Sequence, residues 1–346
     1  MTSTMRYFKW AFIVTAVGII LSFILGWSFT GTFAGALGFL GIAFVLCILE
    51  ISLSFDNAIV NANKLKTMTP VWQRRFLTWG ILIAVFGMRI VFPLLIVVVA
   101  ANIGPIDAIV LAATDPDEYA RIIDDAHLSI AAFGGAFLMM VALSFFTDAE
   151  KDVDWIRGIE TVLRKAGQMR SAEVSVVLVV VMGFAWLMPE KYLADFLFAA
   201  LGGLLTFLLV DMLGHFLDRP ETAETAAKGG LGAFLYLEVL DASFSFDGVI
   251  GAFALTQNLF LIAIGLGVGA MYVRSMTIML VEKETLSQFR YLEHGAFWSI
   301  LILSIIMFSQ TLWHIPEVIV GLLGAGFIAM ALLSSLRYRR AAVGGA

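Results

Sequence analysis

The 346-residue sequence has few of the residues on which many soluble proteins depend. It contains one cysteine, Cys47, and only 14% of its residues are charged. A single cysteine excludes an intrachain disulfide and argues against a thiolate metal site. Soluble domains carry roughly 25% charged residues, so the scarcity of charge places the chain outside that class. The net charge of −5 and the lack of a basic face argue against nucleic-acid binding.

The chain is correspondingly rich in apolar residues. They make up 60% of the chain, well above the roughly 45–50% of soluble domains. Runs long enough to cross a bilayer lie near 10–29, 34–56, 77–100, 128–147, 173–189, 193–216, 230–253, 258–280, 295–313 and 315–336. The sequence therefore predicts an all-α, polytopic transmembrane helix bundle of about ten spans.

The distribution of basic residues predicts the orientation of these spans. If the N-terminus is cytoplasmic, the outer segments hold only Arg121 and Lys191, while Arg89 and Arg274 lie within spans. All the other lysines and arginines then lie in inner segments, as the positive-inside rule requires. We therefore expect a multi-pass protein of the bacterial inner membrane with both termini in the cytoplasm.

One polar stretch occurs twice inside the apolar runs. Residues 49–59 align with residues 240–250 and share the pattern acid-x-Ser-x-Ser-Phe-Asp. The alignment pairs Glu50 with Asp241, Ser52 with Ser243, Ser54 with Ser245, and Asp56 with Asp247. Each charged side chain at the centre of a span costs on the order of 2.5–3.5 kcal/mol, and intramembrane acids are functional by default. Acids that are simply satisfied by their neighbours remain the alternative.

The two copies lie on spans that run in opposite directions under this orientation. Residues 1–190 and 191–346 would then form two halves related by inversion, within a single integral membrane domain. Inverted repeats that meet at a polar midplane site are typical of secondary transporters. We expect Glu50 and Asp241 near the middle of the membrane, with Asp56 toward the cytoplasm and Asp247 toward the outside.

The donor types in the repeat favour a hard divalent cation. Carboxylate, hydroxyl and amide oxygens suit Mg²⁺, Ca²⁺ or Mn²⁺ rather than Zn²⁺ or Cu⁺. Ser54, Ser245 and Glu238 are possible secondary ligands, and Arg89 and Arg274 could balance charge. Exchange of the ion for protons would make an antiport cycle.

The geometry of an unbroken helix separates the acids of the first copy. Glu50 and Asp56 would point about 120° apart, so one helix face cannot hold both. Either the backbone unwinds near 53–55, or Asp56 serves a separate neighbour such as Arg89 or the other half of the chain. Gly248 and Gly251 make unwinding plausible in the second copy, and the first copy has no glycine or proline there.

Three segments between the spans carry weaker signals. The outer segment 101–127 is rich in acids, which either draws cations to the protein or simply keeps the loop solvated. Segment 148–172 has apolar residues at helical spacing against basic ones, as in an amphipathic helix that lies on the cytoplasmic surface. Segment 218–224 is interpreted as a hinge or a plain linker. His215 is interpreted as an interface residue rather than a ligand.

The segment 54–58 after Glu50, Ser-Phe-Asp-Asn-Ala, and its echo at 245–249 resemble the TerC family of tellurium-resistance membrane proteins, in its longer DUF475 branch. This resemblance implies a place in the LysE-type transporter superfamily, a three-plus-three inverted repeat and manganese export. It also implies that Glu50, Asp56, Asn57, Asp241 and Asp247 bind the metal ion. The chain departs from the Asp-Asn pairing at Gly248, where the second copy lacks the amide.

The leading hypothesis is therefore a divalent-cation exporter, with manganese as the first candidate ion and calcium as the alternative. Its expected partners are the lipid bilayer and the cation, which is its substrate, and no organic cofactor is expected. The rival hypothesis is a membrane-embedded metal-handling partner or enzyme that uses the same acids without transport. Catalysis would favour a nucleophile or a histidine base in one half only, whereas both copies carry the same polar set, so we do not expect an enzyme.

Overall fold

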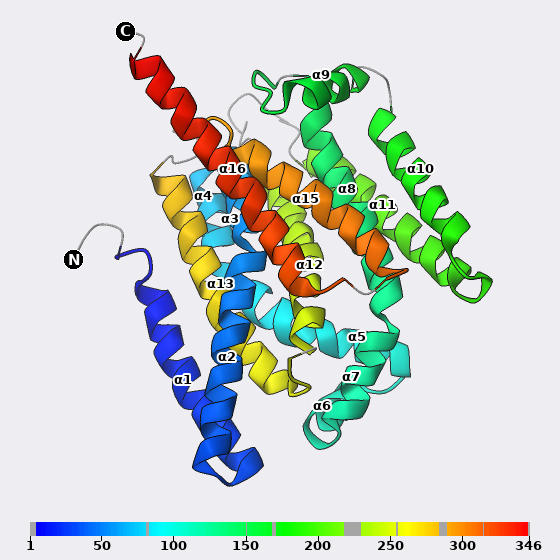
Figure 1. Cartoon of the computed structure of the whole chain (residues 1–346). Helices are drawn as coiled ribbons and strands as arrows, with labels where there is room; N and C mark the ends of the chain where they lie inside the picture. The colour runs from blue at the N-terminus through cyan, green and yellow to red at the C-terminus, as the bar shows by residue number, and fades with distance from the viewer. Residues whose placement is uncertain are drawn as a thin grey trace. The chain divides into compact units, whose positions relative to one another are not determined.

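The computed structural model describes residues 5–80, 83–149, 151–167, 171–217, 230–253, 255–283, 289–313 and 315–344. Within these residues the chain is helical and contains no strand, which confirms the predicted all-α fold (Figure 1). The predicted linker 218–224 lies outside the described residues.

The helices follow one another along the chain with short connections. They are α1 (Lys9–Thr30), α2 (Phe33–Leu53), α3 (Phe55–Lys66), α4 (Pro70–Arg75), the π-helices η1 (Phe76–Gly80) and η2 (Ile83–Val91), α5 (Phe92–Ala101), α6 (Pro105–Thr114), α7 (Pro116–Asp125), α8 (His127–Thr147), α9 (Arg157–Ala166), α10 (Ala172–Leu187), α11 (Glu190–Leu217), α12 (Leu231–Phe253), α13 (Leu259–Glu282), α15 (Leu292–Gln310) and α16 (Glu317–Gly344).

Among the described helices, 7 are long and apolar enough to cross a membrane: α1, α2, α8, α11, α13, α15 and α16. The protein is therefore a multi-pass membrane protein. The other three predicted runs are not among these 7 helices, for reasons that the structure shows. Run 77–100 is divided among η1, η2 and α5, α10 has only 16 residues, and α12 carries three acids in its apolar sequence. The number of spans and the inverted repeat stay predictions.

The first copy of the motif contains a helix boundary, and the second does not. Helix α2 ends at Leu53, Ser54 has non-helical backbone angles, and α3 begins at Phe55. The backbone N–H of Ser54 still donates to the carbonyl of Glu50 at 2.9 Å, so the interruption is slight. By contrast, α12 continues from Leu231 to Phe253 through the second copy. The unwinding considered for 53–55 is thus present as a short break, and the glycines of the second copy do not interrupt their helix.

The chain divides into two compact units, and both copies of the motif belong to the first unit. This unit consists of Met1–Ala58, Pro70–His127 and Glu238–Met279. Helices α1 and α2 form a hairpin in it, which turns at Gly31 in the left-handed conformation (φ 64°) (Figure 1). A side chain at Gly26 would lie 2.8 Å from the Cα of Ala36, so glycine permits the close approach of these helices.

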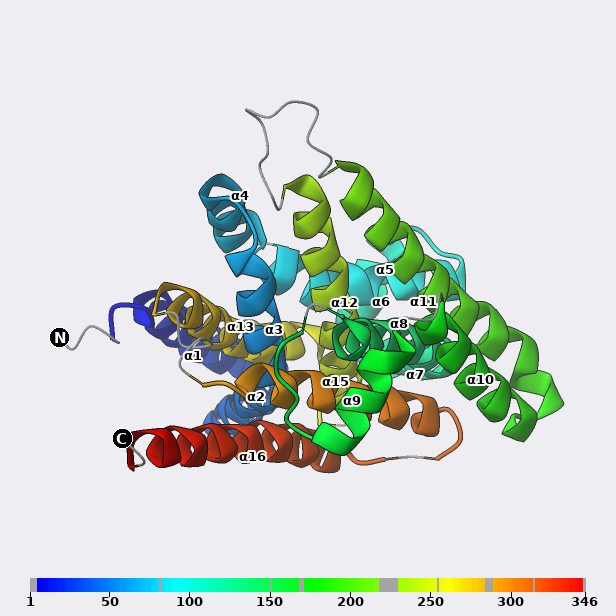
Figure 2. The same ribbon diagram turned by 90° about the horizontal axis from the view of Figure 1, so that it is seen from above.

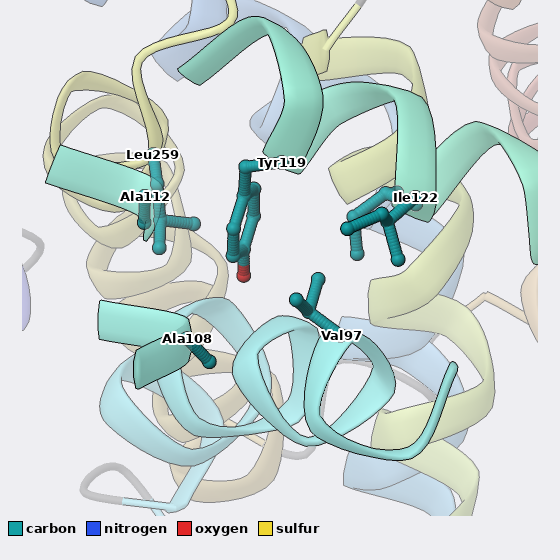
Figure 3. Packing of buried hydrophobic residues seen from close by; sticks show 7 residues of the cluster. Val97, Ala108, Ala112, Tyr119, Ile122 and Leu259 are labelled. Atoms are coloured by element: carbon teal, nitrogen blue, oxygen red, sulfur yellow. The ribbon is translucent and has the colours of Figure 1, made fainter. Parts of the chain in front are cut away.

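Two apolar clusters form the core of the first unit. One joins α2, α12 and α13 through Leu46, Val249, Ala252, Ile262 and Leu266, and it lies beside the motif residues in sequence. The other surrounds the fully buried Tyr119 of α7, which packs among residues of α5, α6 and α13 (Figure 3). The acid-rich segment 101–127 therefore contains two ordered helices, α6 and α7, that pack around a hydrophobic centre.

The second unit consists of Ile59–Thr69, Leu128–Leu237 and Leu280–Ala346. Helices α8 and α15 carry its most buried apolar surface, and Phe145 stacks on Phe297 at a ring distance of 3.9 Å. Helix α16 lies alongside α15 in both views (Figures 1 and 2), where a side chain at Gly295 would lie 2.5 Å from the Cβ of Ala331. Close packing of small residues is how helices associate inside lipid.

Candidate functional site

Glu50, the first acid of the first motif copy, is buried in the last turn of α2. Its side chain is 1% exposed. The Oε1 atom accepts a hydrogen bond from Ser54 Oγ at 2.9 Å and forms an ion pair with Nη2 of Arg89. Arg89, in η2, is itself buried. A buried charge is tolerated only when it is paired and hydrogen-bonded, so Arg89 explains how Glu50 remains inside the helix bundle.

Two glycines lie close to Glu50. A Cβ atom at Gly269 of α13 would lie 2.6 Å from the Cβ of Glu50 and 2.9 Å from the carbonyl oxygen of Cys47. A Cβ atom at Gly248 of α12 would lie 3.3 Å from the Oε2 of Glu50. The acid of the first motif copy therefore lies directly against the backbone of the second copy.

The second copy also has an arginine beside its acids, from α13, the helix that follows α12. Arg274 of α13 interacts electrostatically with Asp241 and with Glu238, both on α12. Its guanidinium also lies over the ring of Phe76 at 4.6 Å and donates a hydrogen bond to the carbonyl oxygen of Phe76. Asp241 is partly buried, and Arg274 is 8% exposed. Each copy thus has a buried arginine beside its acid.

Glu238, one turn before Asp241, is buried against η1. It is 8% exposed, and a Cβ atom at Gly80 would lie 2.9 Å from its Oε1. Within the described part of the chain, neither carboxylate oxygen has a hydrogen-bond partner. The positive charge of Arg274 acts on this carboxyl group.

Three further predicted ligands, Asp56, Asn57 and Ser245, are also buried on the two motif copies. Asp56 is 4% exposed, and its Oδ1 accepts a hydrogen bond from the backbone N–H of Asn57 at 2.9 Å. Asn57 Oδ1 and Ser245 Oγ are buried and have no hydrogen-bond partner among the described residues. The side chains of Asp247 and His215 lie outside the described residues.

The acids do not form a ready-made metal centre. Among the described side chains, no group of three or more histidines, cysteines, aspartates and glutamates is placed to hold a metal ion. Glu50 and Arg89 together are electrically neutral, so they add no net attraction for a cation. A cation held by these residues would need hydroxyl, amide or backbone oxygens in addition to the carboxylates, which are donors that hard divalent ions accept.

A second buried acid, Glu160 of α9, was not among the predicted site residues. It lies in the second unit, is 0% exposed, and joins the amphipathic segment to α15. Its carboxylate binds the ring nitrogen Nδ1 of His294 at 2.7 Å, the indole Nε1 of Trp298 at 2.9 Å and the Nζ of Lys151 at 3.0 Å. Backbone N–H groups of Trp155 and Ile156 also donate to it. The signal in the sequence was a single acid in the first turn of a helix whose other charged residues are basic.

The environment of Glu160 favours its ionised form. Burial by itself raises the pKa of this carboxyl group, but the hydrogen bonds from His294 and Trp298 and the charge of His294 act in the opposite direction. Their sum holds the pKa of Glu160 well below its ordinary value. Glu160 is therefore an anionic anchor for α9.

The exposed face of that helix carries Ile159 and Val162, so part of the predicted apolar face points outward.

Comparison with known proteins assigns the chain to a family without a known activity. The family model described as "Protein of unknown function (DUF475)" matches residues 55–342, so the chain belongs to this family. No curated protein and no solved structure matches it. The match includes the last residues of the first motif copy and all of the second.

Proposed function

We propose that the protein is a secondary transporter that exports a divalent metal cation, manganese in the first place, across the inner membrane. The proposal extends to cation/proton antiport, with both termini in the cytoplasm. Its main support is that Glu50 of the first motif copy lies against Gly248 of the second copy, within one compact unit. Helices that bring two oxygen-rich motifs together inside an apolar bundle resemble the central sites of transporters.

The chemistry of the two motifs also supports this proposal. Buried polar residues from both copies supply carboxylate, hydroxyl and amide oxygens, and sulfur is absent from the motifs. Such a set prefers Mn²⁺, Mg²⁺ or Ca²⁺ over Zn²⁺. The resemblance of the motifs to those of TerC proteins, and through them to the LysE-type superfamily, favours manganese as the substrate and calcium as the alternative.

The structure also suggests how the acids take part in transport. Glu50 is neutralised by Arg89, and Asp241 lies in the field of Arg274, so an arriving divalent ion would compete with two guanidinium groups. Release of the acid from its arginine would open the site, and re-formation of the pair would expel the ion. The arginines thereby balance part of the negative charge of the empty carrier, and the exchanged protons balance the rest.

The test is uptake of Mn²⁺, Ca²⁺, Mg²⁺ and Zn²⁺ into inverted membrane vesicles that contain the protein. We expect Mn²⁺ uptake that is lost in both Glu50→Gln and Asp241→Asn, because an amide only partly replaces a charged ligand. Glu190→Gln, at an exposed acid in the first turn of α11, is the matched control and should transport normally. The proposal would be refuted if both motif variants took up as much Mn²⁺ as the wild type, or if the wild type took up Zn²⁺ in preference to Mn²⁺.

The rival function is a membrane-embedded metal-handling partner or enzyme. It has one observation in its favour: Glu50 is already paired with Arg89, and an acid with a fixed partner has less need of a cation. The two functions are distinguished when Mn²⁺ binding to the purified protein is measured beside Mn²⁺ uptake into vesicles. Purified protein that binds Mn²⁺, together with vesicles that take up none, would favour the rival.

A further inference from the structure

The two carboxylate oxygens of Glu50 have different surroundings. Oε1 is engaged by Arg89 and Ser54, whereas Oε2 points toward the backbone of Gly248. Gly269 lies close to the other end of this side chain, since a Cβ atom there would lie 2.6 Å from the Cβ and 2.7 Å from the Cγ of Glu50. The position of Oε2 is therefore defined by helix packing, and the absence of a side chain at position 248 leaves space next to it.

A buried hydroxyl group lies on the same face of α12 as this space. Ser245 precedes Gly248 by three residues, which is close to one helical turn. Its side chain is 4% exposed, and its Oγ has no hydrogen-bond partner within the described residues. A buried hydroxyl without a partner costs free energy, so its presence here indicates a bound group that completes its hydrogen bonding or coordination.

The repeat explains why glycine occupies position 248. The equivalent residue of the first copy is Asn57, whose amide is buried. An asparagine at position 248 would direct its amide toward Oε2 of Glu50, because even a Cβ atom would lie only 3.3 Å from that oxygen. The departure from repeat symmetry therefore leaves space beside Oε2 of Glu50.

We propose that Glu50 Oε2, Ser245 Oγ and the space at Gly248 form a seat for a divalent cation, and that Gly248 sets the size of this seat and hence ion selectivity. The inference rests on the proposed transport function and deepens it. Gly248 acts as a positioning residue, since it leaves room for the ion without binding it. The two oxygens come from different motif copies, so a single ion would link them.

The size argument can be made quantitative. A methyl group at 248 would force Oε2 to move by a few tenths of an ångström. That displacement is comparable with the difference of about 0.3–0.5 Å between the ligand distances of Mg²⁺ and Ca²⁺. Gly248→Ala should therefore disfavour Ca²⁺, the ion with long ligand distances, more than it disfavours Mn²⁺.

The experiment is calorimetric titration of Mn²⁺ and of Ca²⁺ into purified full-length protein and into Gly248→Ala. We expect the ratio of the two affinities to change by about tenfold, the low end of what one added methylene does to discrimination in a packed site. Gly41→Ala is the matched control, because position 41 lies on α2 and has open space around its Cβ. An unchanged ratio in a folded Gly248→Ala protein would overturn the inference.

A second variant keeps the inference testable if Gly248→Ala fails to fold. Ser245→Ala adds no volume and should weaken the binding of both ions about tenfold. Unchanged affinity in Ser245→Ala would remove the hydroxyl from the seat and overturn the proposal. If the wild type binds ions with these variant effects but vesicles transport none, the seat stands and the transport function fails. If the wild type binds neither ion, both proposals fail.

Discussion

The ion pair between Glu50 and Arg89 shows how single residues depend on one another inside this protein. Both side chains are buried. The arginine lies on the π-helix η2, which is well separated from Glu50 in sequence. Removal of one member of such a pair leaves an uncompensated charge, which costs more than the pair itself contributes.

Arg89→Met is therefore expected to lower the free energy of unfolding by about 3–5 kcal/mol. The double variant Glu50→Gln/Arg89→Met should recover most of that loss, because no unpaired charge remains. Unfolding of purified protein in detergent measures both effects. Arg121→Met is the control at an exposed ion pair of α7, for which a change of about 0–1 kcal/mol is expected. Equal losses in the single and double variants would contradict the interpretation of a mutually dependent pair.

At the scale of the element, α9 illustrates how a short helix is attached by one residue. Helix α9 has 10 residues, too few for independent stability in water. Glu160 joins it to α15 through His294 and Trp298, and Asp154 binds Arg164 and Thr161 within the same segment. The segment was predicted as a helix held by lipid, whereas the structure shows a polar anchor to the protein as well.

Glu160→Gln should loosen this segment. The amide keeps one acceptor oxygen but loses the charge-assisted bonds, so we expect a cost of about 1–3 kcal/mol. Limited trypsin cleavage after Arg157 and Lys165, both exposed, should become faster than in the wild type. Glu190→Gln provides the control at an exposed acid. Cleavage at an unchanged rate would mean that other contacts hold α9 in place.

The same anchor predicts a dependence of stability on pH. The pKa of Glu160 is lower in the folded protein than its ordinary value of 4.5. Its contribution is therefore complete above the unfolded-state pKa and is lost progressively as pH falls below that value toward the folded pKa. Melting temperatures of the wild type and Glu160→Gln should differ at pH 7 and converge on acidification below about pH 4.5. A difference that grows on acidification would contradict the assigned direction.

At the scale of the whole molecule, the distribution of basic residues predicts the topology in the membrane. The positive-inside distribution predicts that residues 101–127 are external and that α9 is cytoplasmic. In a Cys47→Ala background, a cysteine at exposed Asp117 should react with an impermeant reagent added outside intact cells. A cysteine at exposed Lys165 should react only in inverted vesicles. Labelling of the Asp117 position only from the cytoplasmic side would overturn the inverted-repeat interpretation.

The amino-acid sequence alone determined the class of protein and most of its helices. Hydrophobicity is additive along the chain, so long apolar runs predict helices and membrane insertion without reference to distant residues. The repeated motif was likewise visible by alignment of the sequence with itself. It directed attention to Glu50, Asp241 and their neighbours before any contact was known.

The tertiary structure alone decided how these residues are arranged. It showed that α12 passes unbroken through the second copy, whereas a break after Leu53 separates α2 from α3 in the first. It also showed that Glu50 contacts Gly248 and that Glu160 anchors α9. These features depend on which side chains from distant segments meet, and on distances of a few tenths of an ångström between packed helices. Local sequence patterns predict neither these contacts nor these distances, because packing depends on all neighbouring side chains together.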